Sequence, residues 1–444
     1  MADAPAKTKS GLFKALGPGL LFAGTSVGVS ELVQSTRAGA DYSFALLIVI
    51  VLACVLKYPA FAFGPWYAHA TGVSLLEGYR RQGKWALVLF LLVTLGTVFT
   101  VQATVTAVAA SILVSVLGLQ WDGAVGGLNF GPVVVVAGAL LLACALLLRA
   151  GEYRWLDAIN KVLILLLTVS TVVATALALG RLDVSAATAA LPPGMLENRG
   201  ELVRITGLIG WTPSAYDVAV WHSLWFLAHR IEKKHNPTLR EARLDFNIGY
   251  WFSSFTSVCF LVLGAALMFQ QKQKFPADAA GFANALIGLY AGTFGEWARP
   301  LLGVCAFSAM FSTVLSVTDS FPRVLAMLVA RFREPEQAES PAPLPRRLYW
   351  TAMAVISLLA LGILAAVPAP GKGAFTFKTL LDTATTLSFL SAPFIGALNH
   401  RAMFSRDVPE AMRPGPLLRW FSLGSIVFSV GFGLYFLYIT YLAG

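Results

Sequence analysis

The chain has 444 residues, of which 57% are hydrophobic and only 13% are charged, and its formal net charge is +10. Ordinary soluble domains carry about 25% charged residues. Apolar runs of about 17–25 residues, long enough to cross a bilayer, recur along the whole chain. The composition therefore argues against a soluble enzyme, a disordered chain and a nucleic-acid-binding protein, and it indicates an integral membrane protein.

About eleven membrane-spanning helices are predicted from the apolar runs and from the charges, prolines and glycines that bound them. The third run is too long for a helix perpendicular to the membrane, so we expect it to tilt or to project from the bilayer. In chain order, the predicted spans are residues 16–34, 44–66, 85–117, 133–148, 162–179, 205–228, 246–269, 301–321, 349–367, 380–398 and 420–442.

Basic residues set the expected orientation, because Lys and Arg are retained on the cytoplasmic side. With the N-terminus inside, about 22 of them fall in inner segments and about 8 in outer segments. We therefore expect a plasma (inner) membrane protein with residues 1–15 in the cytoplasm and the C-terminus on the extracellular or periplasmic side. The lipid bilayer is then a partner of the chain, and the positive charge requires no nucleic acid. Residues 331–347, rich in Pro, Glu and Ala, predict a flexible cytoplasmic loop.

Two of the predicted spans are interrupted near the middle of the membrane. The first contains glycines and hydroxyl residues: Gly17, Gly19, Gly24, Thr25, Ser26, Gly28 and Ser30. The sixth contains glycines, a proline and a carboxylate: Gly207, Gly210, Thr212, Pro213, Ser214 and Asp217. Such sequences weaken a helix and free backbone carbonyls. Irregular backbone at this depth is tolerated only where it is buried in protein or lines a cavity.

Interrupted helices five spans apart indicate an inverted-repeat transporter whose substrate site lies between the two breaks. The expected architecture is an all-α membrane protein, with a five-helix repeat at 16–182, an extracellular loop at 183–204, a second inverted repeat at 205–398 and an extra helix at 420–442. The alternative is that these glycines and prolines only allow close helix packing, as they do in many transmembrane helices.

Ionisable side chains inside the membrane are costly, and they are therefore candidates for function. Glu31 follows the first break and Asp217 follows the second, so both carboxylates are expected to face one central cavity; the alternative is a pair of buried structural caps or salt bridges. Lys57 lies midway through the second span. We expect it to be an internal counter-ion within reach of these carboxylates, in place of a coupling ion, or else to snorkel to water. His222 is either a proton relay or a buried core histidine.

The candidate substrate site combines the residues around both breaks. Its expected members are Thr25, Ser26, Gly28, Ser30, Glu31, Thr212, Ser214 and Asp217. The carboxylates of Glu31 and Asp217 are the candidate metal ligands, because carboxylate, hydroxyl and carbonyl oxygens suit Mg²⁺ or another hard cation. The same oxygens equally suit a small polar solute that is not a metal.

Three segments carry a family resemblance: GPGLLFAGTSVGVSELVQSTRAGADYSFALL at 17–47, ATGVSLLEGYR at 70–80 and YRWLDAINKVLILLL at 153–167. Together with the proline-containing break in the sixth span, they resemble the Nramp family of divalent-metal transporters over nearly the whole chain. The resemblance implies a LeuT-like fold of 5+5 inverted repeats with broken helices 1 and 6. It also implies secondary active transport of a small ion by alternating access.

The chain departs from this family at the residues that carry its chemistry. The metal-binding Asp-Pro-Gly-Asn tetrad falls on residues 28–31, which read Gly-Val-Ser-Glu, and the sixth-helix Met-Pro-His falls on residues 212–214, which read Thr-Pro-Ser. The third helix lacks, at 97–111, the acidic residues of the family's proton route. Loss of the methionine sulfur argues against selection of Mn or Fe over hard ions. The expected cargo is a divalent cation with hard oxygen ligands, of the Mg or Mn class.

Other classes of function stay open. A transporter of this fold can carry a non-metal small polar solute, and a non-transporting sensor can retain the same fold. An intramembrane hydrolase is suggested by residues 24–28, which match Gly-x-Ser-x-Gly, but that motif requires a strand-to-helix turn and a nearby His base. We therefore expect no enzymatic activity and no cofactor, and any bound divalent cation is expected to be the substrate.

Overall fold

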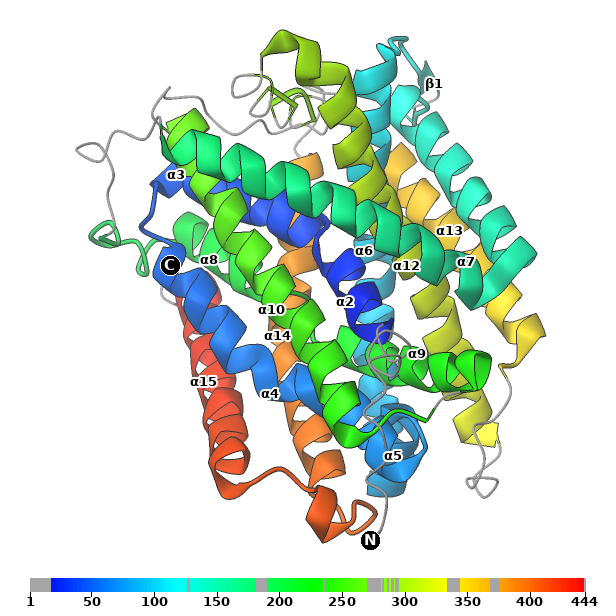
Figure 1. Cartoon of the computed structure of the whole chain (residues 1–444). Coiled ribbons are helices and arrows are strands. Elements are labelled where there is room, and N and C mark those ends of the chain that lie inside the picture. The colour runs from blue at the N-terminus through cyan, green and yellow to red at the C-terminus, as the bar shows by residue number, and fades with distance from the viewer. Residues whose placement is uncertain are drawn as a thin grey trace, which may run out of the picture.

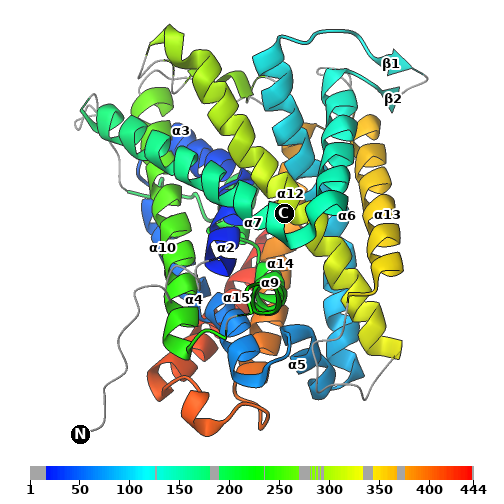
Figure 2. The same ribbon diagram turned by 45° about the vertical axis from the view of Figure 1, so that its right-hand side comes forward.

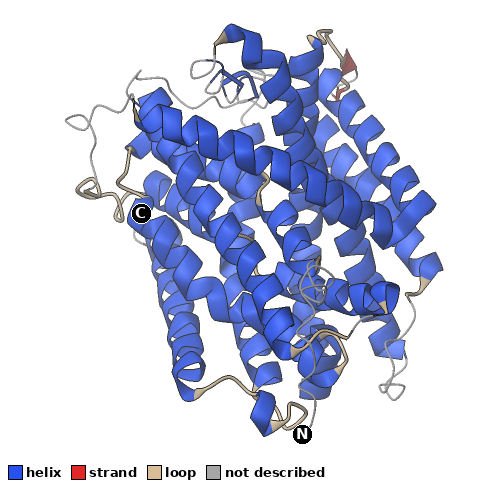
Figure 3. Cartoon of the chain, viewed as in Figure 1, coloured by secondary structure: helices blue, strands red, loops and turns tan. Residues whose placement is uncertain are grey.

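The computed structural model is almost entirely helical, and Figure 3 shows helices running through nearly all of the described chain. It describes residues 17–442 except for 126–127, 181–189, 235, 270–280, 282, 286, 289–290, 292–294, 334–343 and 368–375. The expected cytoplasmic N-terminus at 1–15 therefore lies outside the described residues. So do the start of the predicted extracellular loop and the middle of the predicted cytoplasmic loop.

The elements follow one another in the order shown in Figure 1. In the first part of the chain they are α2 (Pro18–Ser26), the π-helix η1 (Val29–Ser35), α3 (Thr36–Tyr42), α4 (Leu47–Thr71), α5 (Leu75–Gln82), α6 (Lys84–Leu117), the antiparallel strands β1 (Ala124–Val125) and β2 (Leu128–Asn129), and α7 (Pro132–Leu179). In the rest they are α8 (Arg199–Trp211), α9 (Val218–Lys233), α10 (Leu239–Leu263), the π-helix η2 (Gly264–Phe269), η3 (Glu296–Ala298), α12 (Arg299–Arg333), α13 (Arg346–Ala366), α14 (Phe377–Met403), η4 (Glu410–Met412) and α15 (Pro416–Tyr441).

Seven helices in the described part of the chain are long and apolar enough to cross a membrane. They are α4, α6, the first part of α7, α10 with η2, most of α12, α13 and α15. The other predicted spans correspond to the interrupted elements α2–η1–α3 and α8–α9, to the second part of α7, and to α14, which carries Lys378 and Asp382. The predicted all-α fold with a broken first and sixth helix is confirmed.

Both breaks have a local cause in the sequence. α2 ends before Val27 and Gly28, and the chain then continues as the π-helix η1. A Cβ atom at Gly28 would lie 2.2 Å from the Thr313 hydroxyl oxygen, so glycine is required for α12 to approach this closely. The sixth span is interrupted between α8 and α9 by residues 212–217, which include Pro213.

The connection between the fourth and fifth spans differs from the prediction. The sequence placed a break in the helix at 149–161, but α7 is continuous over its 48 residues, which would measure about 72 Å if straight. Figures 1 and 2 show that α7 bends sharply, so its two arms run in different directions. Residues 149–161 contain charges but no proline, and most are adequate helix formers. The charges therefore mark the expected edge of the membrane without ending the helix.

The broken first helix packs against α10 with the two backbones in direct contact. A Cβ atom at Gly19 would lie 1.9 Å from the carbonyl oxygen of Asp245, and one at Gly249 would lie 1.9 Å from the carbonyl oxygen of Gly19. The Asp245 carboxylate also accepts hydrogen bonds from the backbone N–H groups of Gly17, at 3.0 Å, and Gly19, at 2.7 Å. α2 is thereby held at a fixed position along α10, because sliding would break these bonds.

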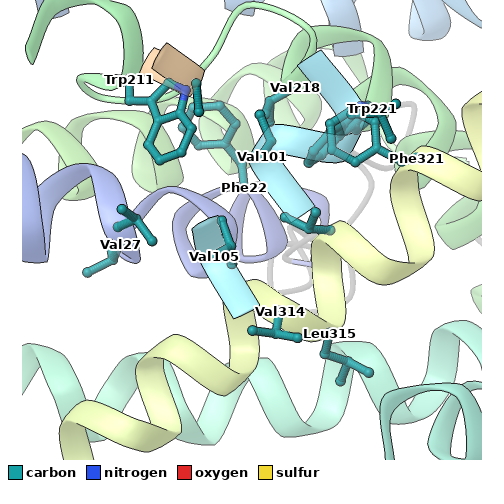
Figure 4. Packing of buried hydrophobic residues seen from close by; sticks show 14 of the residues in the cluster. Phe22, Val27, Val101, Val105, Trp211, Val218, Trp221, Val314, Leu315 and Phe321 are labelled. Carbon is teal, nitrogen blue, oxygen red and sulfur yellow. The ribbon is translucent and has the colours of Figure 1, made fainter. Parts of the chain in front are cut away.

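The main hydrophobic core lies where the first and sixth helices meet α6 and α12. Figure 4 shows its side chains converging from all four elements. The labelled residues are Phe22, Val27, Val101, Val105, Trp211, Val218, Trp221, Val314, Leu315 and Phe321. Both breaks are therefore surrounded by packed protein, as irregular backbone within a membrane requires.

Replacing Gly249 by Ala is expected to destabilise the protein, because the added methyl group meets the backbone of α2. Overpacking of this kind costs about 1–3 kcal/mol. The measurement is the apparent Tm of the purified protein in detergent. Gly96→Ala on α6 is the matched control, since no atom lies within 4 Å of the Cβ position there. An unchanged Tm for Gly249→Ala would contradict the backbone contact between α2 and α10.

Candidate functional site

A small cavity lies at the two helix breaks. Its volume is about 40 Å³, and roughly 10–15 Å³ of such space holds one water, so it has room for a small ion with few waters. Figure 4 shows several of its wall residues in the core between the first helix, α6 and α12. The lining residues are Thr25, Val29, Ser30, Val101, Val105, Trp211, Ser214, Ala215, Asp217, Val218, Trp221, Thr313 and Val317.

Asp217 supplies the carboxylate of this cavity wall. The residue is 7% exposed, and its Oδ1 atom has no hydrogen-bond partner. It is also the N-cap residue of α9, where the positive end of the helix dipole favours a negative charge. Burying a carboxylate oxygen without a partner is costly. The cavity therefore offers one unpartnered carboxylate oxygen, a ligand suited to a cation.

Three hydroxyl groups in the wall already donate their protons to backbone carbonyls. Thr25 donates at 2.8 Å to the carbonyl oxygen four residues earlier in α2. Thr313 of α12 donates at 3.0 Å to the carbonyl of Gly24, and Ser30 donates to the carbonyl of Ser26. A hydroxyl oxygen that donates its proton keeps lone pairs to offer. These side chains can therefore present oxygen acceptors to a cation.

Glu31 does not line this cavity, contrary to the expectation that it would share one with Asp217. Its side chain is fully buried and accepts a hydrogen bond from Ser253 on α10 at 2.6 Å. The Ser30 hydroxyl on η1 lies 2.6 Å from the other carboxylate oxygen, so its single proton is shared between Glu31 and the carbonyl of Ser26. Consecutive residues of a helix point to different faces. Because Ser30 is in the cavity wall, Glu31 is turned toward α10. The two candidate metal ligands are therefore held in different surroundings.

The structure divides the predicted substrate site into two groups. The residues that line the cavity are Thr25, Ser30, Ser214 and Asp217. Those that are buried beside the breaks without lining it are Ser26, Gly28, Glu31 and Thr212. The hydroxyl groups of Ser26 and Thr212 have no hydrogen-bond partner. Their oxygens are therefore buried polar atoms beside the cavity that the protein itself leaves without a partner.

Lys57 is buried against the break in the sixth span. Its ammonium group donates to four backbone carbonyls, those of Ile209 (2.9 Å), Gly210 (3.1 Å), Thr212 (2.9 Å) and Ser214 (2.6 Å). The residue is only 3% exposed, so it does not snorkel to water. Within the described chain no ion pair joins Lys57 directly to a carboxylate, although its charge is close enough to interact with those of Glu31 and Asp217. Its role as a coupling or counter-ion residue stays a prediction.

His222 lies in the aromatic core and does not line the cavity. Its ring stacks on Phe22 with the centroids 5.8 Å apart, and its centroid is 5.6 Å from that of Phe246. Both ring nitrogens are buried without a hydrogen-bond partner. These contacts fit the alternative of a core histidine, and the relay role stays a prediction.

Ion pairs join different helices near one end of the bundle, where α3 lies in Figure 1. Arg37 of α3 contacts Asp382 of α14 at 2.7 Å, and Arg204 of α8 contacts Asp41 of α3 at 3.3 Å. These four residues form the α3-end cluster. It ties both broken helices to α14 on one side of the cavity.

A second group of ion pairs lies toward the opposite end, where Figure 1 shows α5. The fully buried Glu77 of α5 contacts Arg80 at 2.6 Å, Arg81 at 3.3 Å and Arg331 of α12 at 3.4 Å. These four residues form the α5-end cluster. Charged contacts thus join helices on both sides of the cavity.

The parts of the wall that come from α6 and α12 were not predicted from the sequence. Val101, Val105 and Val317 are ordinary apolar residues in long helices, and Thr313 stands among small residues with no nearby break or charge. Nothing in their local sequence distinguishes them from packing residues. Trp211 and Ala215, by contrast, adjoin predicted site residues in sequence, and this proximity was the available signal.

A preformed metal cage is not visible in the part of the chain that the structure describes, where no group of three or more His, Cys, Asp and Glu side chains is placed to hold an ion. A cation in the cavity would depend on Asp217, hydroxyl and carbonyl oxygens, and water. Mg²⁺ is commonly bound in this manner, through one or two carboxylates and several retained waters.

Comparison with known proteins finds relatives over almost the full length. The profile of a family described as natural resistance-associated macrophage protein-like (Nramp) matches residues 19–439. An uncharacterised protein of Pasteurella multocida is 32% identical over 434 residues, covering 96% of this chain and 92% of that protein.

Several solved structures share the fold, including two that match nearly the whole chain. A manganese transporter of Eremococcus coleocola is 15% identical with a TM-score of 0.72, over 99% of this chain and 88% of the other. MhsT, solved in complex with L-phenylalanine, is 14% identical with a TM-score of 0.64, over 99% of this chain and 100% of the other. Both have the LeuT fold, so the expected LeuT-like architecture is confirmed.

Replacing Ser253 by Ala is expected to lower the apparent Tm, because one carboxylate oxygen of Glu31 then loses its hydrogen-bond donor in a fully buried position. An unsatisfied buried polar group costs about 1–3 kcal/mol, and more when it is charged. Ser257→Ala is the matched control: Ser257 is equally buried on α10 but donates only to the carbonyl of Ser253, at 3.2 Å. Equal Tm values for the two variants would contradict the assigned role of Ser253.

Proposed function

Because the chain belongs to the Nramp family, we propose that it is a secondary active transporter that carries a small cation across the membrane by alternating access. The proposed cargo is a divalent cation with hard oxygen ligands, of the Mg²⁺ or Mn²⁺ class. One observation carries the proposal: Asp217 is a buried carboxylate with an unpartnered oxygen in the wall of the cavity at the two helix breaks.

The other oxygens near Asp217 support a hard cation. Thr25, Ser30 and Thr313 offer hydroxyl oxygens whose protons are already donated to the backbone. No lining residue is a methionine, cysteine or histidine, and soft or borderline ligands are the ones that favour later transition metals. One structural relative is a manganese transporter, and Mn²⁺ also accepts carboxylate and water ligands. The site chemistry therefore favours Mg²⁺ and Mn²⁺ over Cu or Zn.

The two ion-pair clusters support alternating access. Each cluster includes one helix that lines the cavity, α8 in the α3-end cluster and α12 in the α5-end cluster, and the clusters lie toward opposite ends of the bundle. A path to the cavity from either side requires one cluster to separate while the other stays closed. Charged contacts suit this role, because water can replace the lost partners of charged groups when the contacts open.

Asp217→Asn is expected to reduce uptake of Mg²⁺ and Mn²⁺ into proteoliposomes by at least about tenfold, because the amide keeps the size of the side chain but removes the charge. Calorimetry on the purified protein should show a matching loss of binding heat. Asp122→Asn, at an exposed position before β1, is the matched control and should keep wild-type flux. Absence of both flux and binding heat for Mg²⁺, Mn²⁺ and Ca²⁺ in the wild type would overturn the metal proposal.

A non-metal small polar solute is the second candidate, and the composition of the cavity wall favours it. Trp211, Trp221, Val101 and Val105 give the wall large apolar surfaces, which a bare ion does not use. A small organic cation would place its charge at Asp217 and its apolar part against these residues. Flux of such a solute without flux of any metal would select this candidate, and metal binding without flux would select the non-transporting sensor.

Breaking one ion-pair cluster is expected to open the cavity from the side on which that cluster lies. The reporter is Thr25→Cys in the cavity wall, labelled by a membrane-impermeant maleimide added to either side of sealed vesicles. Adding Asp382→Asn should raise labelling severalfold from the α3 end, and Arg331→Gln should raise it from the α5 end. Labelling that is insensitive to both substitutions would contradict the assignment of the clusters as gates.

A further inference from the structure

The ammonium group of Lys57 occupies a cradle of backbone oxygens at the end of α8. Two of the four carbonyls, those of Ile209 and Gly210, belong to the last turn of α8, whose carbonyls have no partner within the helix. The other two, those of Thr212 and Ser214, belong to the interrupted segment. The negative end of a helix dipole attracts a cation at this position.

The contacts have the character of a cation site. All four oxygens lie 2.6–3.1 Å from Nζ, whereas an ammonium group has only three protons to donate. The faces of two aromatic rings complete the surroundings, with centroids 5.1 Å away for Tyr216 and 5.8 Å away for Phe61. Unwound carbonyls at the C-terminal end of a half-helix are the ligands that bind monovalent coupling ions in transporters with interrupted helices.

We propose that this cradle is a monovalent-cation site that the chain fills with its own side chain, so that the Lys57 ammonium takes the place of a dissociable coupling cation. The cradle is connected to the cavity through the backbone. Ser214 accepts a hydrogen bond from Lys57 and also lines the cavity, and Asp217 follows three residues later. Lys57 is therefore a positioning residue for Asp217, and it acts through the shape of residues 212–217.

The inference predicts how transport depends on monovalent cations. A tethered cation cannot leave, so wild-type flux should be the same in sodium, potassium and choline chloride. Removal of the ammonium leaves four carbonyls directed at an empty space, which costs stability because buried carbonyls lose their partner. An external cation of suitable size should then bind in this space and restore the native conformation of residues 212–217.

The test is chemical rescue of Lys57→Ala. The atoms that this substitution removes correspond to n-propylammonium, and 1-propanol is a neutral molecule of nearly the same shape. We expect Lys57→Ala to lower both the apparent Tm in detergent and the uptake rate, the latter by about tenfold or more. Propylammonium chloride, and more weakly ammonium or potassium chloride, should restore both values in a saturable manner, and 1-propanol or choline chloride should not.

Lys57→Met provides the matched control, because the methionine side chain occupies most of the space of the lysine side chain without supplying a charge. It should lose activity as Lys57→Ala does, but propylammonium should not restore it, since the space is occupied. Wild-type protein should show no change in Tm with any of these compounds.

The Tm readout separates this inference from the proposed function, which enters only through the flux measurement. Saturable Tm rescue without any flux in the wild type would support the cradle and contradict transport. Failure of every monovalent cation to raise the Tm or the folded yield of Lys57→Ala would overturn the inference. Wild-type Tm and flux in Lys57→Ala without added cation would overturn it as well.

Discussion

Backbone groups that are freed inside a membrane must find partners within the protein, and much of this fold is arranged around that requirement. At the first break, the carbonyl of Gly24 accepts hydrogen bonds from Thr313 at 3.0 Å and Ser312 at 3.2 Å, both on α12. At the start of the same helix, the Asp245 carboxylate of α10 accepts from two backbone N–H groups. At the second break, Lys57 of α4 supplies the donors. Three separate helices therefore stabilise the two interrupted ones.

The positions of the breaks could be predicted from the sequence because glycine, proline and hydroxyl residues leave a local signal. The contacts that the side chains around these breaks make could not be predicted in this way. Ser30 lines the cavity, whereas its neighbour Glu31 contacts α10. These directions depend on the register of the π-helix η1, which the sequence did not predict. Lys57 was identified as unusual, but its partners are carbonyl groups, which every residue has, so the sequence could not distinguish them from carboxylates. The continuity of α7 was missed because charges indicate the membrane surface and not the end of a helix.

Lys57 and Asp217 lie at opposite ends of the second break. The segment between α8 and α9 has the negative end of one helix dipole at its start and the positive end of another at its finish. The Lys57 ammonium group binds carbonyls at the end of α8, and Asp217 is the N-cap residue of α9. Each charge is thus placed where the backbone stabilises it, so the two need not contact each other. The break thus has one basic and one acidic side chain at its two ends.

The glycine contacts between α2 and α10 have a mechanical consequence. A similar pair joins the next stretch of the same two spans, since a Cβ atom at Gly39 would lie 2.0 Å from the carbonyl oxygen of Leu261, and one at Gly264 would lie 2.2 Å from that of Thr36. Because these close contacts lie on both sides of the first break, a displacement of the first span would have to move the span of α10 and η2 with it. On its other flank, the first span is joined to α12 by the buried hydroxyl hydrogen bonds at Gly24 and by the close approach of Thr313 to Gly28. The first span contributes Thr25, Val29 and Ser30 to the lining of the cavity, so its fixed position against α10 and η2 also fixes this part of the wall.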